Sequence, residues 1–174
     1  KDIKEGLKLG VDFIALSFVR SDKDVQELSS LLKRVKNKPE IFAKIEDQQG
    51  MDSIEVITKH SDGLLVARGD LGIETDITNL PYVQRKMVKV ALQSGKKCIV
   101  ATQLLESMVT NPQPTRAEVS DVANAVYEGA DALMLSAETT VGDFPLKCVK
   151  YLSDIAKNAE RSETLHFENN MKSI

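Results

Sequence analysis

The sequence has no long hydrophobic run and little cysteine, and each shortage excludes a class of protein. The longest apolar stretches in its 174 residues are the size of a β-strand, whereas a membrane span needs about 20 apolar residues. No membrane partner is therefore expected. Cysteine occurs only at Cys98 and Cys148. Because nothing else marks the chain as secreted, we expect two free buried thiols in a reduced, cytoplasmic protein.

Basic runs and glycine-rich phosphate loops are also absent. The net charge is -3, and no cluster of lysine and arginine indicates binding to nucleic acid. No G-x-G-x-x-G pattern occurs, which argues against a nucleotide-binding doubly wound fold. The chain begins at Lys1 without a methionine or a signal-like segment, so we expect a piece of a longer protein.

What the sequence does contain is a repeated unit of strand and helix. Five short apolar runs predict buried parallel strands at 11–17, 40–45, 63–67, 97–101 and 131–135. Helical patterns alternate with them at 1–9, 22–36, after Gly50, at 81–94, at 115–128 and from Pro145 onward. The alternation predicts an α/β fold with a parallel sheet, and the missing phosphate loop favours a (β/α) barrel of the TIM type. We expect about five strands and six helices of the eight units, an incomplete barrel.

Polar side chains follow every predicted strand. In chain order these are Ser17 and Arg20, Lys44 and Glu46, Arg68 and Asp70, Thr102 and Gln103, and Ser136 and Glu138. Barrels carry their chemistry where strands end, so a ring of such groups is what a site needs. Exposed strand ends are polar in any protein, but three of these pairs are spaced two residues apart, which keeps both members on one side.

The pair Glu46 and Asp70 predicts a metal site. Both are hard oxygen ligands on neighbouring strands and suit Mg²⁺ or Mn²⁺, which accept one or two carboxylates and keep several waters. Lys44 adds a positive charge, and a metal with a lysine forms a clamp for a transferring phosphoryl group or a developing enolate oxygen. We expect the burial of Lys44 and Glu46 to be offset by a cation and an anionic substrate rather than by each other.

Two further features suit this chemistry. Gly69 and Gly72 flank Asp70, so the backbone can turn tightly and offer N–H groups to a carboxylate or phosphate, although a plain βα turn has the same pattern. Thr102 carries a hydroxyl that suits a proton-transfer chain, while a cap is the commoner role of a threonine at such a position.

Long motifs resemble one family along residues 1 to about 160. The stretches KIED, VARGDLGIE, ATQLLESM, NPQPTRAEVSDVANAVYEGADALMLSAET and GDFP resemble pyruvate kinase. The resemblance implies a glycolytic kinase that transfers phosphate from phosphoenolpyruvate to ADP, giving ATP and an enolate that is protonated to pyruvate. It also implies a (β/α)8 barrel with an inserted β-domain and a C-terminal regulatory domain. Residues 1–162 would be the C-terminal portion of the barrel, and 163–174 a loosely held polar tail leading towards that domain.

The resemblance assigns roles residue by residue at the predicted site. Lys44 would neutralise charge on the transferring phosphoryl group and the enolate oxygen, and Glu46 and Asp70 would bind Mg²⁺ or Mn²⁺. The substrate would contact a set shared by three strand ends: Ser17, Lys44, Ala67, Gly69, Asp70 and Thr102. Thr102 would lie near the carbon that is protonated. The family also uses K⁺, whose ligands match no position in this chain.

Other residues receive supporting roles from the same resemblance. Arg68 would order its loop and contact a subunit, and Gln103 would support the site. Ser136 and Glu138 would belong to a proton relay through water. Arg116, in the PTRAE motif, would lie at the barrel–barrel contact of a homo-oligomer, a homotetramer in the full-length family.

The sequence departs from the family pattern in a few positions. Asp47 replaces a common asparagine, Leu104 a common methionine, and Val141 a lysine near the nucleotide, which leaves the ADP contacts open. The match covers only part of a barrel, so we expect the 174-residue piece to be inactive alone. Two alternatives remain: another barrel lyase or aldolase that acts on phosphoenolpyruvate or a pyruvate enolate, and a truncated paralogue that serves only as a metal-binding or oligomerisation module.

Overall fold

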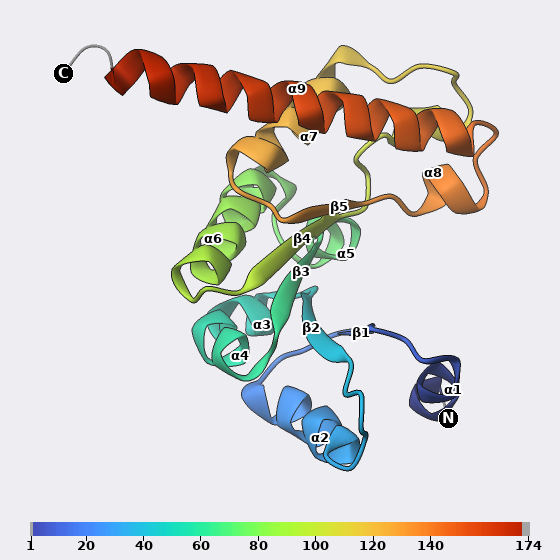
Figure 1. Ribbon diagram of the computed structural model, residues 1–174, viewed down its shortest axis with the longest axis vertical. Coiled ribbons are helices and arrows are strands. Elements are labelled where there is room, and N and C mark those ends of the chain that lie inside the picture. The colour runs from blue at the N-terminus through green and yellow to red at the C-terminus, as the bar shows by residue number, and fades with distance from the viewer. Residues whose placement is uncertain (1, 172–174) are drawn as a thin grey trace. The chain divides into compact units, whose positions relative to one another are not determined.

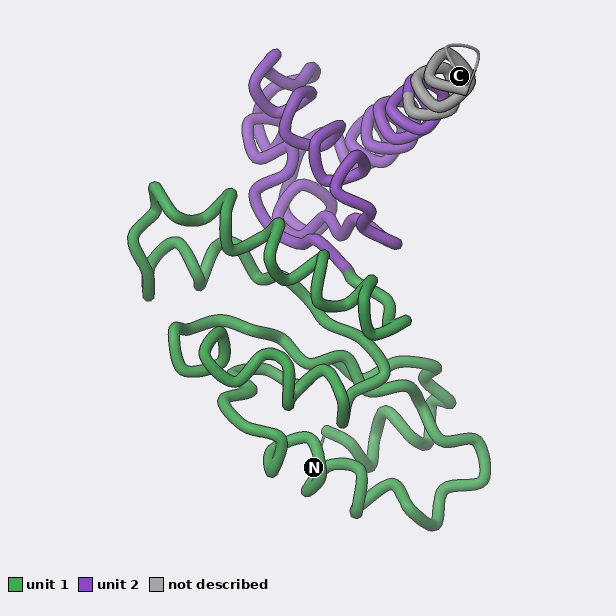
Figure 2. The backbone as a smooth tube through the Cα atoms, turned by 90° about the vertical axis from the view of Figure 1, so that its left-hand side faces the viewer, with its two compact units in different colours: residues 1–98 green, residues 99–174 purple. Residues whose placement is uncertain are grey.

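A computed structural model describes the backbone of residues 2–171 and the side chains of residues 2–162. Strands and helices alternate along the chain in the order that the sequence predicts (Figure 1). The chain forms two compact units, residues 1–98 and residues 99–174, which Figure 2 shows in green and purple. Each unit is an α/β assembly with parallel strands.

The first unit is built on three parallel strands, β1 (Phe13–Leu16), β2 (Glu40–Ile45) and β3 (Gly63–Ala67). β1 pairs with β2 and β2 with β3, in a register that places Leu16 beside Ala43 and Ile45 beside Val66. The carboxyl ends of the three strands therefore lie at one edge. Every residue of β3 is buried, which explains its unbroken apolar sequence.

Helices make up the rest of the secondary structure of this unit. They are α1 (Asp2–Leu9), α2 (Asp22–Leu32), α3 (Gln48–Asp52), α4 (Ile54–His60), α5 (Arg68–Glu74) and α6 (Leu80–Gln93), with a short 3-10 helix, η1 (Ile77–Asn79). The helices α2 and α4 pack on β2, and α6 packs on β3. A capping box between Ser21 and Asp24 starts α2, which buries Val25, Leu28 and Leu32 at helical spacing.

The second unit carries the last two strands. β4 (Lys97–Ala101) begins at the last residues of the first unit and pairs in parallel with β5 (Ala132–Met134). The unit also contains η2 (Glu106–Val109), α7 (Arg116–Tyr127), α8 (Ala137–Thr140) and α9 (Pro145–Met171). The long helix α9 packs against α7 and α8, and Cys148 and Ile155 from α9 join Val122 from α7 among the buried side chains.

The structure confirms the five predicted strands and extends the list of helices. Nine α-helices occur within the described residues. The sequence did not predict the short helices α5 and α8, nor that two helices, α3 and α4, would stand where one was expected. The helix α9 continues through Met171, into the segment predicted as a tail; residues 172–174 lie outside the described part. Cys98 and Cys148 are free, buried thiols, as predicted. No helix among the described residues is both long and apolar enough to cross a membrane.

Candidate active site

Lys44 and Glu46 lie together at the carboxyl end of β2. Lys44 Nζ is 2.7 Å from Glu46 Oε1 and 3.0 Å from the Oγ of Ser17, which follows β1. The Glu46 side chain is 1% exposed and that of Lys44 is 23% exposed. The two-residue spacing does place both charges on one side, but the expectation that they would not offset each other is wrong. The structure pairs the ammonium of Lys44 directly with the buried carboxylate of Glu46.

The loop after β1 is bonded residue by residue to the segment at the end of β2. The contacts are Ser17 Oγ with Lys44 Nζ (3.0 Å), Phe18 N with Glu46 Oε2 (2.5 Å), Val19 N with Lys44 O (3.2 Å) and Arg20 Nε with Asp47 Oδ2 (2.6 Å). Phe18 has a φ of 50°, in the left-handed region that phenylalanine rarely adopts. Four consecutive loop residues thus contact the segment that carries the predicted lysine and metal ligand.

Asp47 connects this loop to the helix that follows. One of its carboxylate oxygens caps α3 by accepting the N–H of Gly50 at 2.9 Å, and the other accepts Arg20. Gly50 has no room for a side chain, because a Cβ there would lie 2.7 Å from the carbonyl oxygen of Val19. Burial alone would raise the pKa of Asp47, but the hydrogen bonds from Gly50 and Arg20 outweigh it, and the pKa lies below its ordinary value.

Asp70 lies in the first turn of α5, directly after β3. It is half-buried, and among the described side chains it makes no hydrogen bond or ion pair. Ala67, at the N-cap, provides no side-chain cap for the first turn of α5, which lies at the end of the strand. Arg68 is buried, with its Nη1 3.4 Å from Gln84 Oε1 of α6, so it ties α5 to its neighbouring helix.

The donors present in the first unit fit a small divalent cation. No group of three or more His, Cys, Asp or Glu side chains that could hold a metal occurs among the described residues. Mg²⁺ does not require one, because it commonly binds one or two carboxylates and keeps its remaining ligands as water. Glu46 and Asp70 each follow a strand of the same parallel set, so both stand at its carboxyl edge.

The second unit presents a different set of residues at its strand ends. Thr102 and Gln103 follow β4 with φ values of 68° and 52°, and Thr102 Oγ1 donates to the carbonyl oxygen of Ala101 at 2.6 Å. A β-branched residue in the left-handed region is a clear outlier, and such strain occurs where surrounding structure enforces it. The surrounding structure therefore holds the backbone of Thr102, which carries the hydroxyl, in a conformation that threonine rarely adopts.

Glu138 binds the loop that follows β4 and the loop that follows β5. It is fully buried, with Oε1 accepting the N–H of Leu105 at 3.1 Å and Oε2 accepting the N–H of Ser136 at 2.8 Å. The carboxylate therefore joins the loop after β4 to the loop after β5. Sequence reasoning placed Ser136 and Glu138 in a proton relay; the structure brings the two together and gives Glu138 two backbone partners.

The remaining predicted residues lie at the surface or in the core of this unit. Arg116 is the first residue of α7 and is exposed. Leu104 is buried, and Val141 is exposed. The pairing of Arg20 with Asp47 was missed by sequence reasoning, which noted both residues without linking them. Only the register of β1 against β2 brings them together.

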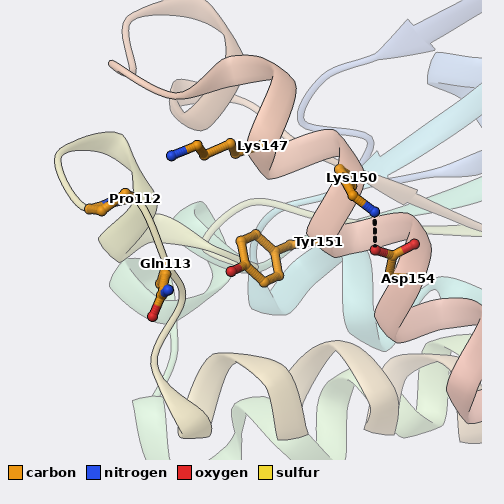
Figure 3. A pocket seen from close by; sticks show the side chains of 6 residues that line it. All are labelled: Pro112, Gln113, Lys147, Lys150, Tyr151 and Asp154. Carbon is orange, nitrogen blue, oxygen red and sulfur yellow. Dashed lines mark hydrogen bonds and ion pairs between the residues drawn. The ribbon is translucent and has the colours of Figure 1, made fainter.

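A separate pocket of about 600 Å³ lies beside α9 and contains none of the predicted site residues (Figure 3). Its lining residues are Pro112, Gln113, Lys147, Lys150, Tyr151 and Asp154. One of its two lysines is already paired, with Lys150 Nζ 2.7 Å from Asp154 Oδ2 (Figure 3). The other, Lys147, lies 5.1 Å from the ring centroid of Phe144.

Comparison with known proteins identifies the relatives of this chain. The family model "Pyruvate kinase, barrel domain" matches residues 1–149. The chain is 46% identical over 168 residues to a pyruvate kinase of Methanocaldococcus jannaschii, covering 97% of this chain and 37% of that protein. It is 49% identical over 162 residues to a pyruvate kinase of Staphylococcus epidermidis, covering 93% of this chain and 28% of that protein.

A solved structure agrees with the sequence matches. The crystal structure of a pyruvate kinase from Cryptosporidium parvum superposes with a TM-score of 0.89 at 40% identity, covering 91% of this chain and 34% of that one. The five parallel strands are therefore part of a TIM barrel domain, as predicted. The chain spans about a third of the length of the relatives it matches.

Proposed function

This chain belongs to the pyruvate kinase family, and we propose that the protein containing it transfers the phosphoryl group of phosphoenolpyruvate to ADP, giving ATP and pyruvate in glycolysis. The observation that carries the proposal is the contact of Lys44 with both Glu46 and Ser17 at the carboxyl end of β2. A partly exposed ammonium beside a buried carboxylate suits a site in which an anionic substrate meets a cation.

The position of each side chain supports the role that we propose for it. The Lys44 side chain is flexible and partly exposed, so its ammonium can turn from Glu46 to the phosphoryl and enolate oxygens of the substrate. Glu46 then keeps its orientation through the N–H of Phe18. The backbone of Ala67, Gly69 and Asp70, at the start of α5, is suited to receive the substrate carboxylate.

The family uses Mg²⁺ and K⁺. We assign the divalent cation, Mg²⁺ or Mn²⁺, to Glu46 and Asp70, where it would neutralise charge on the phosphoryl group and the enolate oxygen. No residue of this chain is assigned to K⁺. In the second unit, the Thr102 hydroxyl is proposed near the carbon that is protonated, and Gln103, Ser136 and Glu138 support the loop that carries it.

Substitution of Lys44 tests the proposal. In the protein expressed from the full reading frame, pyruvate formation from phosphoenolpyruvate and ADP should require Mg²⁺ and should fall about 10²- to 10³-fold in Lys44→Met. Lys97→Met is the matched control, because Lys97 also pairs with a glutamate, Glu40, at 2.9 Å but lies at the amino end of its strand. Equal activity of Lys44→Met and the parent protein would refute the role of Lys44. Residues 1–174 alone, with about a third of the length of the relatives, are expected to form no pyruvate.

We also propose an oligomeric state and a cellular location for the protein. A homo-oligomer is supported by the exposed Arg116 at the start of α7, where the family resemblance places a subunit contact. A cytoplasmic location is supported by the free thiols of Cys98 and Cys148.

A further inference from the structure

Arg20 lies in the loop after β1, and its side chain binds Asp47, the residue after Glu46. Its Nε donates to Asp47 Oδ2 at 2.6 Å, and its guanidinium carbon lies 5.8 Å from the ring centroid of Phe18. The Arg20 side chain is 53% exposed, whereas that of Asp47 is 12% exposed and fixed by its cap on α3. A side chain anchored on Asp47 therefore covers the ring of Phe18.

The orientation of Glu46 depends on Phe18. The backbone N–H of Phe18 donates to Glu46 Oε2, while Lys44 contacts Oε1. Phe18 has a φ of 50°, a conformation that needs support from its surroundings. That support comes from its two successors, since the N–H of buried Val19 donates to the carbonyl oxygen of Lys44 and Arg20 binds Asp47. Loss of the Arg20–Asp47 contact would remove one of the two contacts that support the backbone of Phe18.

We propose that Arg20 and Asp47 form a positioning pair that keeps the N–H of Phe18 on Glu46 and so raises the affinity of the protein for a divalent cation. Neither residue of the pair is assigned as a ligand of the cation or the substrate. The inference rests on the proposed function, because it takes Glu46 as a metal ligand. Partners that orient a metal-binding side chain typically change metal affinity by about 10- to 100-fold.

Electrostatics alone predicts the opposite sign for Arg20. Removing a positive charge near a cation site strengthens cation binding, whereas loss of a positioning contact weakens it. Asp47 cannot make this distinction by itself, because both effects weaken binding when its negative charge is removed. Arg20 is therefore the decisive residue, and its exposed position makes its variants compatible with folding.

The experiment measures Mn²⁺ binding without substrates. The protein from the full reading frame is titrated with Mn²⁺, and free Mn²⁺ is followed by its electron paramagnetic resonance signal. Arg20→Gln should raise the Kd about tenfold, and Arg20→Lys should also raise it, because a lysine keeps the charge but not the planar N–H donor. Arg20→Gln combined with Asp47→Asn should bind no more weakly than the weaker single variant, since both remove one contact.

Controls and kinetics separate positioning from a general loss of structure. Lys150→Gln breaks an ion pair of 2.7 Å with Asp154 on α9 and should leave the Kd unchanged. Glu46→Gln should weaken binding more than any variant of the pair. In assays of pyruvate formation, Arg20→Gln should raise the Mg²⁺ concentration needed for half-maximal rate, while kcat at saturating Mg²⁺ changes less than about twofold.

The outcomes distinguish the two proposals. Unchanged or tighter Mn²⁺ binding by Arg20→Gln, with weakened binding by Glu46→Gln, would overturn the positioning pair and leave the proposed function intact. Unchanged binding by Glu46→Gln would remove Glu46 as a ligand and overturn both. If Asp47→Asn does not fold, the comparison of Arg20→Gln, Arg20→Lys and Lys150→Gln still decides the matter.

Discussion

Glu46 in the first unit and Glu138 in the second are both buried glutamates that closely follow a strand, yet their partners differ. Glu46 gives one oxygen to a backbone N–H and the other to Lys44, whose side chain is partly exposed and can move. Glu138 gives one oxygen to the N–H of Leu105 and the other to that of Ser136, which are fixed parts of two loops. Both glutamates are buried, but one partner of Glu46 is a partly exposed side chain, whereas both partners of Glu138 are backbone groups.

The difference indicates how a carboxylate at a strand end is used. A carboxylate whose partner can turn away is available to a cation or a substrate, whereas one bonded to two backbone groups holds loops together. By this criterion we propose that Glu46 takes part in the chemistry and that Glu138 supports the loop that follows β4.

Exchanging each glutamate for glutamine should reveal the difference between Glu46 and Glu138 most clearly. In Glu138→Gln the amide NH₂ faces a backbone N–H, which leaves a buried donor unpaired at a cost of about 1–3 kcal/mol. We expect amide hydrogen exchange at Leu105 and Ser136 to accelerate by about 10- to 100-fold, following the conversion of 1.4 kcal/mol per factor of ten. Glu46→Gln should accelerate exchange at Phe18 by less than about tenfold, because its amide oxygen can still accept that N–H.

Each variant serves as the control for the other. Exchange at Phe18 should be unchanged in Glu138→Gln, and exchange at Leu105 and Ser136 should be unchanged in Glu46→Gln. Equal acceleration at both sets of amides by either variant would show that the two glutamates do not have separate local roles.

Substitution of Thr102, whose backbone is strained, should have a smaller effect, which we expect in the melting temperature. Glycine adopts a φ of 68° without a steric penalty, so Thr102→Gly should relieve strain of about 1–2 kcal/mol. Part of this gain is lost, because glycine has more freedom in the unfolded chain and the bond from Thr102 Oγ1 to Ala101 O disappears. We expect a melting temperature equal to or slightly above that of the parent, with reduced pyruvate formation.

Phe18→Gly provides the contrast for this prediction. Phe18 is also left-handed, but its ring lies under the guanidinium of Arg20, so glycine there removes a contact that the loop uses. We expect Phe18→Gly to melt below the parent protein. A melting temperature for Thr102→Gly well below that of Phe18→Gly would contradict the account of strain in the second unit.

Local sequence patterns predicted most of the fold. The five strands lie within the predicted runs because each is a short apolar segment between polar turns. The helix α5 was missed because its sequence, RGDLGIE, contains two glycines, which have low helix propensity. It forms where β3 ends and packs against α6, so tertiary context determines it.

The candidate site was predictable in its residues and not in its contacts. The two-residue spacing placed Lys44 and Glu46 on one side of β2, and the polar residues after the next two strands predicted Asp70 and Thr102 before the family resemblance assigned them roles. The bonds between the loop after β1 and residues 44–47 depend on the register of β1 against β2, two strands that α2 separates in the chain, so neither segment alone predicts these contacts. The left-handed φ of Phe18 was equally hidden, since its sequence carries none of the residues that favour that conformation.

The smallest effect concerns Glu118 of α7, a half-buried carboxylate of the second unit that also binds backbone groups. Its oxygens accept the N–H groups of Ser107 and Thr115, both at 2.7 Å, and both hydroxyls as well. Burial alone would raise the pKa of Glu118, but these hydrogen bonds outweigh it and hold the pKa below its ordinary value. A lowered pKa stabilises the folded state above the ordinary glutamate pKa, and this contribution is lost as the pH falls through the lowered value.

Glu118→Gln should therefore be less stable than the parent at pH 7, by about 1 kcal/mol as for a lost helix cap, and the two should converge in acid. Thermal melting of both proteins between neutral pH and about pH 3 measures the difference; this range lies around the ordinary glutamate pKa. Asp154 is the matched control, because its only hydrogen-bond partner found in the described structure is the exposed Lys150, four residues away on α9. A pH-dependent difference for Asp154→Asn as large as that for Glu118→Gln would show that backbone bonding does not distinguish the scaffold carboxylates of this unit from surface ones.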